Sequence, residues 1–134
     1  MEQRSEGPLR YSERDDRFWL VVDVDPEIVE FARSLVPKSI KLNRQKHTPH
    51  ITVVRNEQPV NMVAWRAHEG EIIQFTYSSI VFDDGLYWWL GASCFRLQEV
   101  RIELGLPEYS EFTRPPDMSD LFHITIGNQK LLSV

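Results

Sequence analysis

The sequence of 134 residues has one cysteine, Cys94, which excludes an internal disulfide and a cysteine-based metal site. It also lacks any apolar run near the roughly 20 residues of a membrane-spanning helix, and residues 1–7 have no signal-like apolar stretch. We therefore expect a cytoplasmic protein without a membrane partner. Neither a glycine-rich phosphate loop nor a nucleophile motif is present.

Excess positive charge is lacking as well. The chain has 15 Lys and Arg residues against 20 Asp and Glu residues, a net charge of −5, which argues against a binder of long nucleic acid. One segment, 38–55, departs from this balance because it has several cations and no acidic residue. Its cations are Lys38, Lys41, Arg44, Lys46 and Arg55. The segment is either a solvated basic loop or an electropositive mouth for a compact anion.

Two short segments share a His-x-Thr core, His50-Ile51-Thr52 and His123-Ile124-Thr125. Both lie in apolar, β-prone stretches, which predict strands. Because side chains alternate between the two faces of a strand, His50 and Thr52 share one face, and His123 and Thr125 share one face of theirs. Each motif therefore offers one proton carrier and one hydroxyl donor. The alternatives without a catalytic role are that each histidine is structural and that each threonine is present only because threonine favours strands.

Phosphodiester cleavage requires this combination twice. One imidazole takes a proton from the attacking oxygen, the other gives one to the departing oxygen, and hydroxyl donors hold the phosphate. Such chemistry needs neither a metal nor a cofactor, and we expect none. A zinc site at His47 and His50 is disfavoured because a spacing of three residues puts them on opposite faces of a strand.

Each half of the chain places a strand and a helix before its His-x-Thr strand. Asp25 and Pro26 mark the start of the first helix, and Asp83-Asp84-Gly85 predicts a hairpin turn in the second half. We predict an α+β fold with two pseudo-symmetric lobes, antiparallel sheets flanking a central groove, and helices outside. The predicted organisation is a single domain over 1–134, with a polar N-terminal arm at 1–17 and lobes at about 18–68 and 69–134.

Paired His-x-Thr strands in a small two-lobed chain resemble the 2H phosphoesterase superfamily. The basic stretch 37–55 is similar to that of its compact phage branch, the "Swiss army knife" and anti-CBASS phosphodiesterases. This resemblance implies a phage counter-defence enzyme in the host cytoplasm that cleaves 3′,5′ phosphodiester bonds of cyclic di- or trinucleotides without metal. It also implies that His50 and His123 are the general acid and base and that Thr52 and Thr125 hold phosphate oxygens.

We predict substrate-binding residues from positive charge, which suits phosphates, and from aromatic rings, which can stack on bases. We expect Arg44, Lys46 and Arg55 to meet phosphates, and Tyr11 and Trp88 to stack on bases. Aromatic residues more often fill cores. Tyr87 and Trp89 share the face of their strand opposite to Trp88, so only one of these sets can face a ligand.

Three other functions remain open at this stage. The same chemistry could act on RNA 2′,3′-cyclic ends. The protein could be a sponge that binds a cyclic nucleotide without cutting it, or an interaction protein that uses its acidic surface. The sequence leaves open the preferred bases, the order of acid and base, the product's phosphate form and the oligomeric state.

Overall fold

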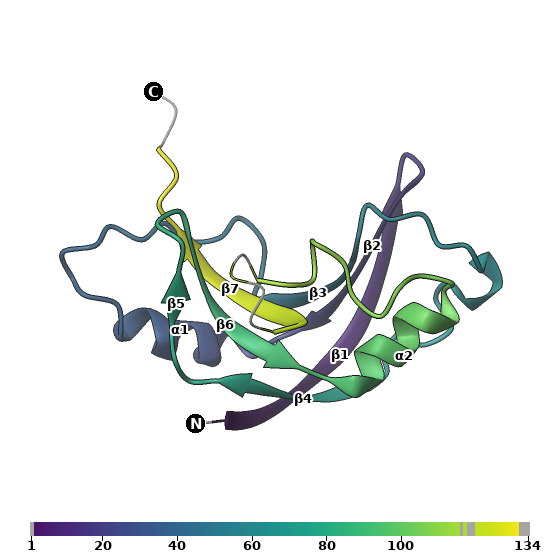
Figure 1. The fold of residues 1–134 in the computed structure, drawn as a ribbon, viewed down its shortest axis with the longest axis horizontal. Coiled ribbons are helices and arrows are strands. Elements are labelled where there is room, and N and C mark those ends of the chain that lie inside the picture. Colours follow the sequence, from purple (N-terminus) through teal and green to yellow (C-terminus); the bar gives the residue numbers. More distant parts are fainter. Residues whose placement is uncertain (1, 116, 118–119, 132–134) are drawn as a thin grey trace.

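The computed structural model describes residues 2–115, 117 and 120–131. Two helices pack on a sheet in which every assigned strand pair is antiparallel, so the predicted α+β class is confirmed (Figure 1). The strands are β1 (Glu2–Arg14), β2 (Arg17–Asp23), β3 (His50–Arg55), β4 (Ile72–Ser78), β5 (Phe82–Asp83), β6 (Tyr87–Ser93) and β7 (Phe122–Asn128). The helices are α1 (Pro26–Ser34), α2 (Phe95–Glu103) and a single 3₁₀ turn, η1 (Met62–Ala64).

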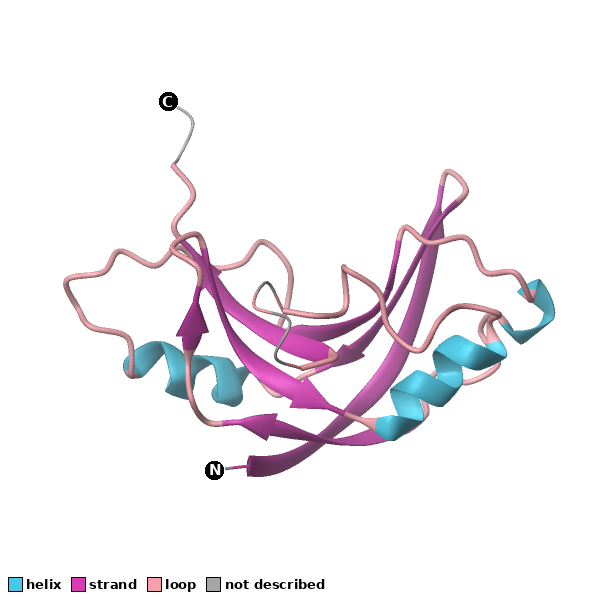
Figure 2. Cartoon of the chain, viewed as in Figure 1, coloured by secondary structure: helices cyan, strands magenta, loops and turns pink. Residues whose placement is uncertain are grey.

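The strands form one continuous sheet in the order β4-β1-β2-β3-β7-β6-β5, and β4 also pairs with β6. This additional pairing closes the six longer strands into a ring. The sheet is therefore strongly curved, with α1 and α2 near opposite ends (Figures 1 and 2). The expectation of separate sheets across a groove is wrong, because β3 and β7 are hydrogen-bonded neighbours with Ile51 opposite Ile124.

The segment predicted as a polar arm, 1–17, instead contains the longest strand of the fold. β1 pairs with β4 through residues 2–8 and with β2 through residues 9–14. Its inward positions Gly7, Leu9 and Tyr11 are buried, while the residues between them are exposed. A tight turn at Asp15 and Asp16, both with positive φ, connects β1 to β2, as a two-residue hairpin loop requires.

Gly7 and Pro8 look like strand breakers in the sequence, yet both fit β1. A Cβ atom at position 7 would lie 1.7 Å from the carbonyl oxygen of Asp23, so only glycine allows this approach of β2. Pro8 occupies the point where pairing passes from β4 to β2. A proline is tolerated there because it interrupts no continuous ladder.

Both helices pack against the apolar face of the sheet and form one hydrophobic core with it. Asp25 caps α1 as predicted, accepting a hydrogen bond from the Glu27 amide at 2.9 Å, and Pro26 is the first helical residue. The core includes Val29 from α1 and Leu97 from α2 together with apolar residues of all the longer strands. Within the described ranges, no helix is both long and apolar enough to cross a membrane.

Candidate active site

The structure brings the two His-x-Thr segments together on neighbouring strands. The antiparallel register that sets Ile51 opposite Ile124 places His50 beside Thr125 and Thr52 beside His123. Side chains of paired residues lie on the same face, so all four polar groups share one face of the sheet. Ile51 and Ile124 are fully buried on the other face. The two histidines are diagonal neighbours, for which Cβ separations of roughly 7–8 Å are typical.

Each histidine is oriented by a backbone carbonyl from the loop that precedes its strand. Nδ1 of His50 lies 2.7 Å from the carbonyl oxygen of Thr48, and Nδ1 of His123 lies 2.9 Å from that of Thr113. A carbonyl can only accept, so Nδ1 of each ring carries the proton. Nε2 of each ring is left to exchange a proton with a ligand, and neither Nε2 has a hydrogen-bond partner among the described residues.

The loop between α2 and β7 supplies the second of these carbonyls. It runs across the middle of the molecule (Figure 1), and Thr113 within it is fully buried. The Thr113 hydroxyl accepts from the Ser110 amide at 2.9 Å and donates to the Ser110 carbonyl at 3.1 Å. This compact turn fixes the carbonyl that orients His123.

Burial lowers the pKa of both imidazoles below the usual value of about 6.5, because desolvation disfavours the imidazolium ion. The carbonyl hydrogen bonds oppose this shift. Positive charge on His50 lowers the pKa of His123 further. Protonation of one ring therefore disfavours protonation of the other, so the state with both rings charged is disfavoured.

Two arginines border the histidines, one at each end. Arg10 of β1 and Asp23 of β2 form a bidentate ion pair at 2.9–3.2 Å, and Asp23 is opposite His50 in the sheet. The charge of Arg10 is close enough to lower the pKa of His50. Arg55, close enough to lower that of His123, lies with its guanidinium 5.6 Å from the centre of the Phe112 ring.

Arg55 is thus the predicted cation that the structure places at the histidines. Arg44 instead forms a bidentate ion pair with Glu30 of α1, and Lys46 is exposed on the connection between α1 and β3. Of the segment 38–55, Arg44 is therefore engaged by α1, while Arg55 lies near His123. Arg10, a cation outside this segment that the sequence analysis missed, lies near His50 and is itself paired with Asp23. The only sign of Arg10 in the sequence is that it lies between the apolar residues Leu9 and Tyr11, as a residue on the opposite face of a strand would.

The two aromatic residues expected to stack on bases lie in the core. Tyr11 is 4% exposed and packs edge-on against Trp65, with ring centres 4.9 Å apart. Trp88 is 8% exposed and donates from Nε1 to Gln129 at 2.7 Å. Both belong to the core cluster. The other face of β6 carries Trp89, which pairs with Thr125, so Trp89 and not Trp88 shares the face of the histidines.

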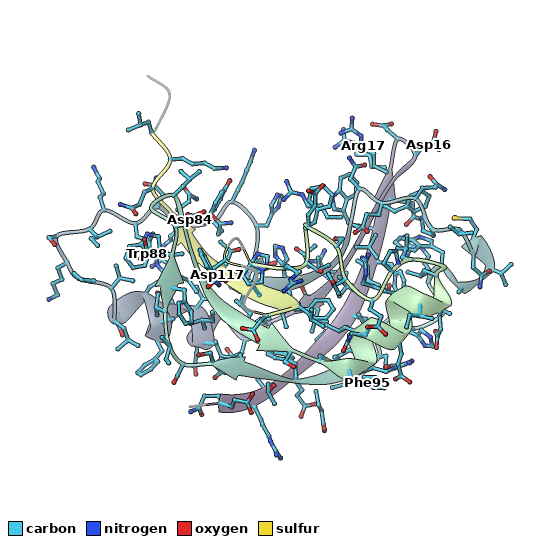
Figure 3. The ribbon with its side chains drawn as sticks, in the orientation of Figure 1. Asp16, Arg17, Asp84, Trp88, Phe95 and Asp117 are labelled. Carbon is cyan, nitrogen blue, oxygen red and sulfur yellow. The ribbon has the colours of Figure 1, made fainter. Side chains whose placement is uncertain are left out.

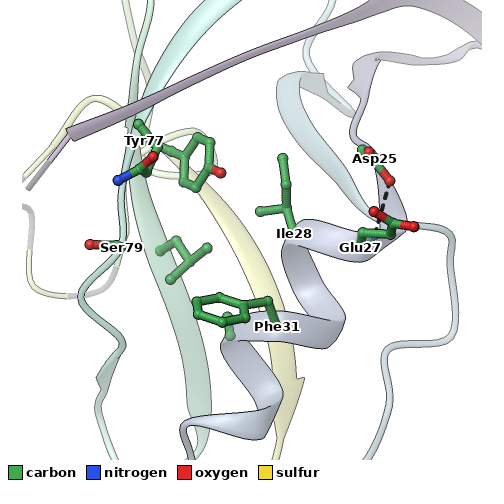
Figure 4. A pocket seen from close by; sticks show the side chains of 9 residues that line it. Asp25, Glu27, Ile28, Phe31, Tyr77 and Ser79 are labelled. Atoms are coloured by element: carbon green, nitrogen blue, oxygen red, sulfur yellow. Dashed lines mark hydrogen bonds between the residues drawn. The ribbon is translucent and has the colours of Figure 1, made fainter.

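Two of the cavities formed by the described residues contain none of the motif residues His50, Thr52, His123 and Thr125. One of about 460 Å³ is lined by Arg10, Asp23, Val24, Pro26, Thr48 and Pro49, the last of which precedes His50. A second of about 420 Å³ lies between α1 and strands β4 and β6, where Ile28, Phe31 and Tyr77 form its walls and Asp25 and Glu27 its rim (Figure 4). The first cavity is the nearer to the motifs, because Thr48 in its wall supplies the carbonyl that orients His50.

Figure 3 shows Asp16 and Arg17 at the tip of the β1–β2 hairpin and Asp84 near the β5–β6 turn, with Asp117 between them. The negative charge of Asp117 raises the pKa of His123, against the larger effect of burial. Within the described ranges, no three His, Cys, Asp or Glu side chains gather as metal ligands.

Comparisons with known proteins identify no relative. No family model matches the chain, and neither a curated protein nor a solved structure is significantly similar to it.

Proposed function

We propose that the protein is a metal-independent phosphodiesterase of the 2H type that cleaves 3′,5′ bonds in cyclic di- or trinucleotides. One observation carries the proposal. Two histidines on neighbouring strands each donate from Nδ1 to a backbone carbonyl, so both Nε2 atoms are free for proton transfer on the face that also carries two threonine hydroxyls. A structural histidine does not require this arrangement twice.

The reaction needs one neutral and one protonated imidazole. The neutral ring removes the proton of the ribose 2′-hydroxyl, and O2′ attacks the adjacent phosphorus. The bond from phosphorus to O5′ breaks, and the imidazolium ring gives its proton to O5′. Thr52 and Thr125 donate hydrogen bonds to the non-bridging oxygens as their charge increases. The products are a 2′,3′-cyclic phosphate end and a free 5′-hydroxyl.

The arrangement of charge favours a compact substrate. Arg10 is close enough to His50, and Arg55 to His123, to lower the pKa of that imidazole, so we expect the two guanidiniums to meet phosphates of one small ring, Arg10 while it is paired with Asp23. The net charge of −5 opposes binding of a long polyanion. The cavity beside His50, with Pro26, Pro49 and Val24 in its walls, offers apolar surface for one base.

The topology also supports the 2H type. Each half of the chain contributes strands, then a helix, then its His-x-Thr strand: β1, β2, α1 and β3 in the first half, and β4, β6, α2 and β7 in the second. In the closed ring β3 pairs with β7 and β1 with β4, so each of these pairs joins corresponding strands of the two halves. We interpret this as a pseudo-twofold repeat whose axis passes between His50 and His123.

The test is substrate choice with product analysis. The protein is incubated with cyclic dinucleotides and trinucleotides, with their 2′-O-methyl counterparts, and with an RNA that ends in a 2′,3′-cyclic phosphate. The proposal predicts cleavage of the cyclic substrates to 2′,3′-cyclic and 5′-hydroxyl ends and no cleavage of the methylated forms. Turnover of the RNA end alone would indicate RNA-end processing, and recovery of intact bound ligand would indicate a sponge.

A further inference from the structure

Two arginines, Arg33 of α1 and Arg101 of α2, make matching contacts in the two halves of the chain. Arg101 donates from Nη1 to the carbonyl of Val53 and from Nε to that of Pro107, both at 2.7 Å. Arg33 donates from Nη1 to the carbonyl of Ile126 and from Nη2 to that of Leu42, both at 2.8 Å. Each guanidinium therefore bridges two backbone segments.

The backbone segments that the two arginines contact occupy corresponding positions in the two halves. Val53 lies three residues after His50, and Ile126 lies three residues after His123. Each arginine thus reaches the His-x-Thr strand of the other half of the chain. Its second acceptor lies in its own half, in the loop that leads to the histidine there: Leu42 precedes His50 and Pro107 precedes His123. The two arginines cross-connect the halves.

Both strand carbonyls belong to bulge residues. On β3, Thr52 pairs with Val21 and Val54 with Leu20, so Val53 has no partner on β2. On β7, Thr125 pairs with Trp89 and Gly127 with Trp88, so Ile126 has none on β6. A bulge disrupts the ladder locally, and buried carbonyls require a donor. The arginines supply those donors immediately beyond the two motifs.

The contacts of Arg101 continue to the carbonyl that orients His123. Arg101, which is fully buried, forms a bidentate ion pair with Glu57 at 2.8–3.0 Å. Glu57 accepts from the Ser110 hydroxyl at 3.4 Å, and Ser110 forms the turn with Thr113, whose carbonyl accepts from His123. On the other side, Arg33 donates to the carbonyls of residues 42 and 43. These residues lie in the same connection between α1 and β3 as Thr48, the anchor of His50, which follows Asn43 by five positions.

Glycine at position 127 reflects the closeness of this packing. A Cβ atom there would lie 2.7 Å from Nη1 of Arg33, 2.8 Å from the Asn43 carbonyl oxygen and 2.6 Å from Cγ of Leu42. Only a residue without a side chain leaves room for the guanidinium to reach Ile126.

We infer that Arg33 and Arg101 are positioning residues that fix the tautomer and orientation of His50 and His123, respectively. The catalytic consequence rests on the proposed phosphodiesterase function, whereas the effect on the imidazoles does not. A planar guanidinium serves several acceptors at once, and a lysine ammonium on a flexible stem does not reproduce that geometry. Lysine at either position therefore keeps the charge and loses the bridging contacts.

The test measures the imidazole nitrogens of R33K and R101K by long-range ¹H–¹⁵N NMR on folded protein. Wild type should show both rings protonated at Nδ1. R101K should mix the tautomers of His123 more than those of His50, and R33K should do the reverse. If the protein is a phosphodiesterase, each variant should also lose up to about 100-fold in kcat, with KM changed by less than about twofold.

Two further variants keep the test decisive. Gly127→Ala crowds Nη1 of Arg33 together with Leu42 and the Asn43 carbonyl without changing any charge, so it should reproduce the effect of R33K on His50. R96K is the control, because Arg96 also lies on α2 but pairs with Glu71 at 2.8 Å, and its partners among the described residues lie outside β3 and β7. Unchanged tautomers in folded R33K and R101K, even with a lower Tm, would overturn the inference and leave these arginines a structural role alone.

Discussion

Replacing Arg101 by methionine tests the packing around the site most severely. The side chain is 0% exposed, and its loss leaves the carbonyls of Val53 and Pro107 without a donor and Glu57, 15% exposed, without its cation. Removing one partner of a buried ion pair costs about 3–5 kcal/mol. With an unfolding entropy of about 2.1 cal/mol/K per residue, a loss of about 4 kcal/mol lowers Tm by roughly 14 °C for a chain of this length.

The assay is thermal and urea unfolding followed by circular dichroism. Arg96→Met is the matched control, because its partly exposed ion pairs with Glu71 and Glu103 should contribute at most about 1 kcal/mol. The double variant Arg101→Met/Glu57→Leu should recover part of the loss, because it leaves no buried charge unpaired. A drop of less than about 4 °C for Arg101→Met, the shift expected from about 1 kcal/mol, would refute the assigned role of this ion pair.

Three further results follow from the structure. Burial lowers the pKa of His50 and His123, so the unfolded chain binds more protons than the folded protein below about pH 6.5. The free energy of unfolding should therefore fall as pH falls through that value. His→Gln variants should flatten this pH dependence, which is measured by urea midpoints. Asp25→Ala removes the α1 cap and should destabilise the fold by about 1 kcal/mol; an unchanged urea midpoint would exclude the cap. Arg10→Gln and Arg55→Gln should raise KM for a cyclic dinucleotide about tenfold with little change in kcat, by loss of a charge-assisted contact; equal KM values would remove both from the binding site.

Local pattern was enough to predict how the two motifs present their side chains. Strand parity put the histidine and threonine of each motif on one face, and the structure agrees at His50, Thr52, His123 and Thr125. The pairing of β3 with β7 is a long-range contact that no local pattern encodes, so the predicted separate sheets were wrong. Thr113 illustrates a stronger limit, because its backbone carbonyl anchors His123 and any residue type could supply that atom.

Misleading local signals explain the other errors. Gly7 and Pro8 suggested an irregular arm, but a close approach of Asp23 and a change of pairing partner make both suitable for β1. The charge run at 38–55 was compatible with a solvated loop or a binding mouth, and it gave no sign that Glu30 of α1 pairs with Arg44. Alternation identified two sets of aromatics on β6 without indicating which faced the histidines, and pairing of Trp89 with Thr125 decides this.

The most direct test of the account is cleavage of a cyclic dinucleotide in excess EDTA by wild type, His50→Ala, His123→Ala and the double variant. The account predicts activity that EDTA leaves unchanged and a loss of about 10²–10⁴-fold in kcat for each single variant. The double variant should be little worse than either single one, because the two rings act as a unit. Activity retained by either single variant, or abolished by EDTA in wild type, would contradict a metal-independent mechanism that uses both histidines.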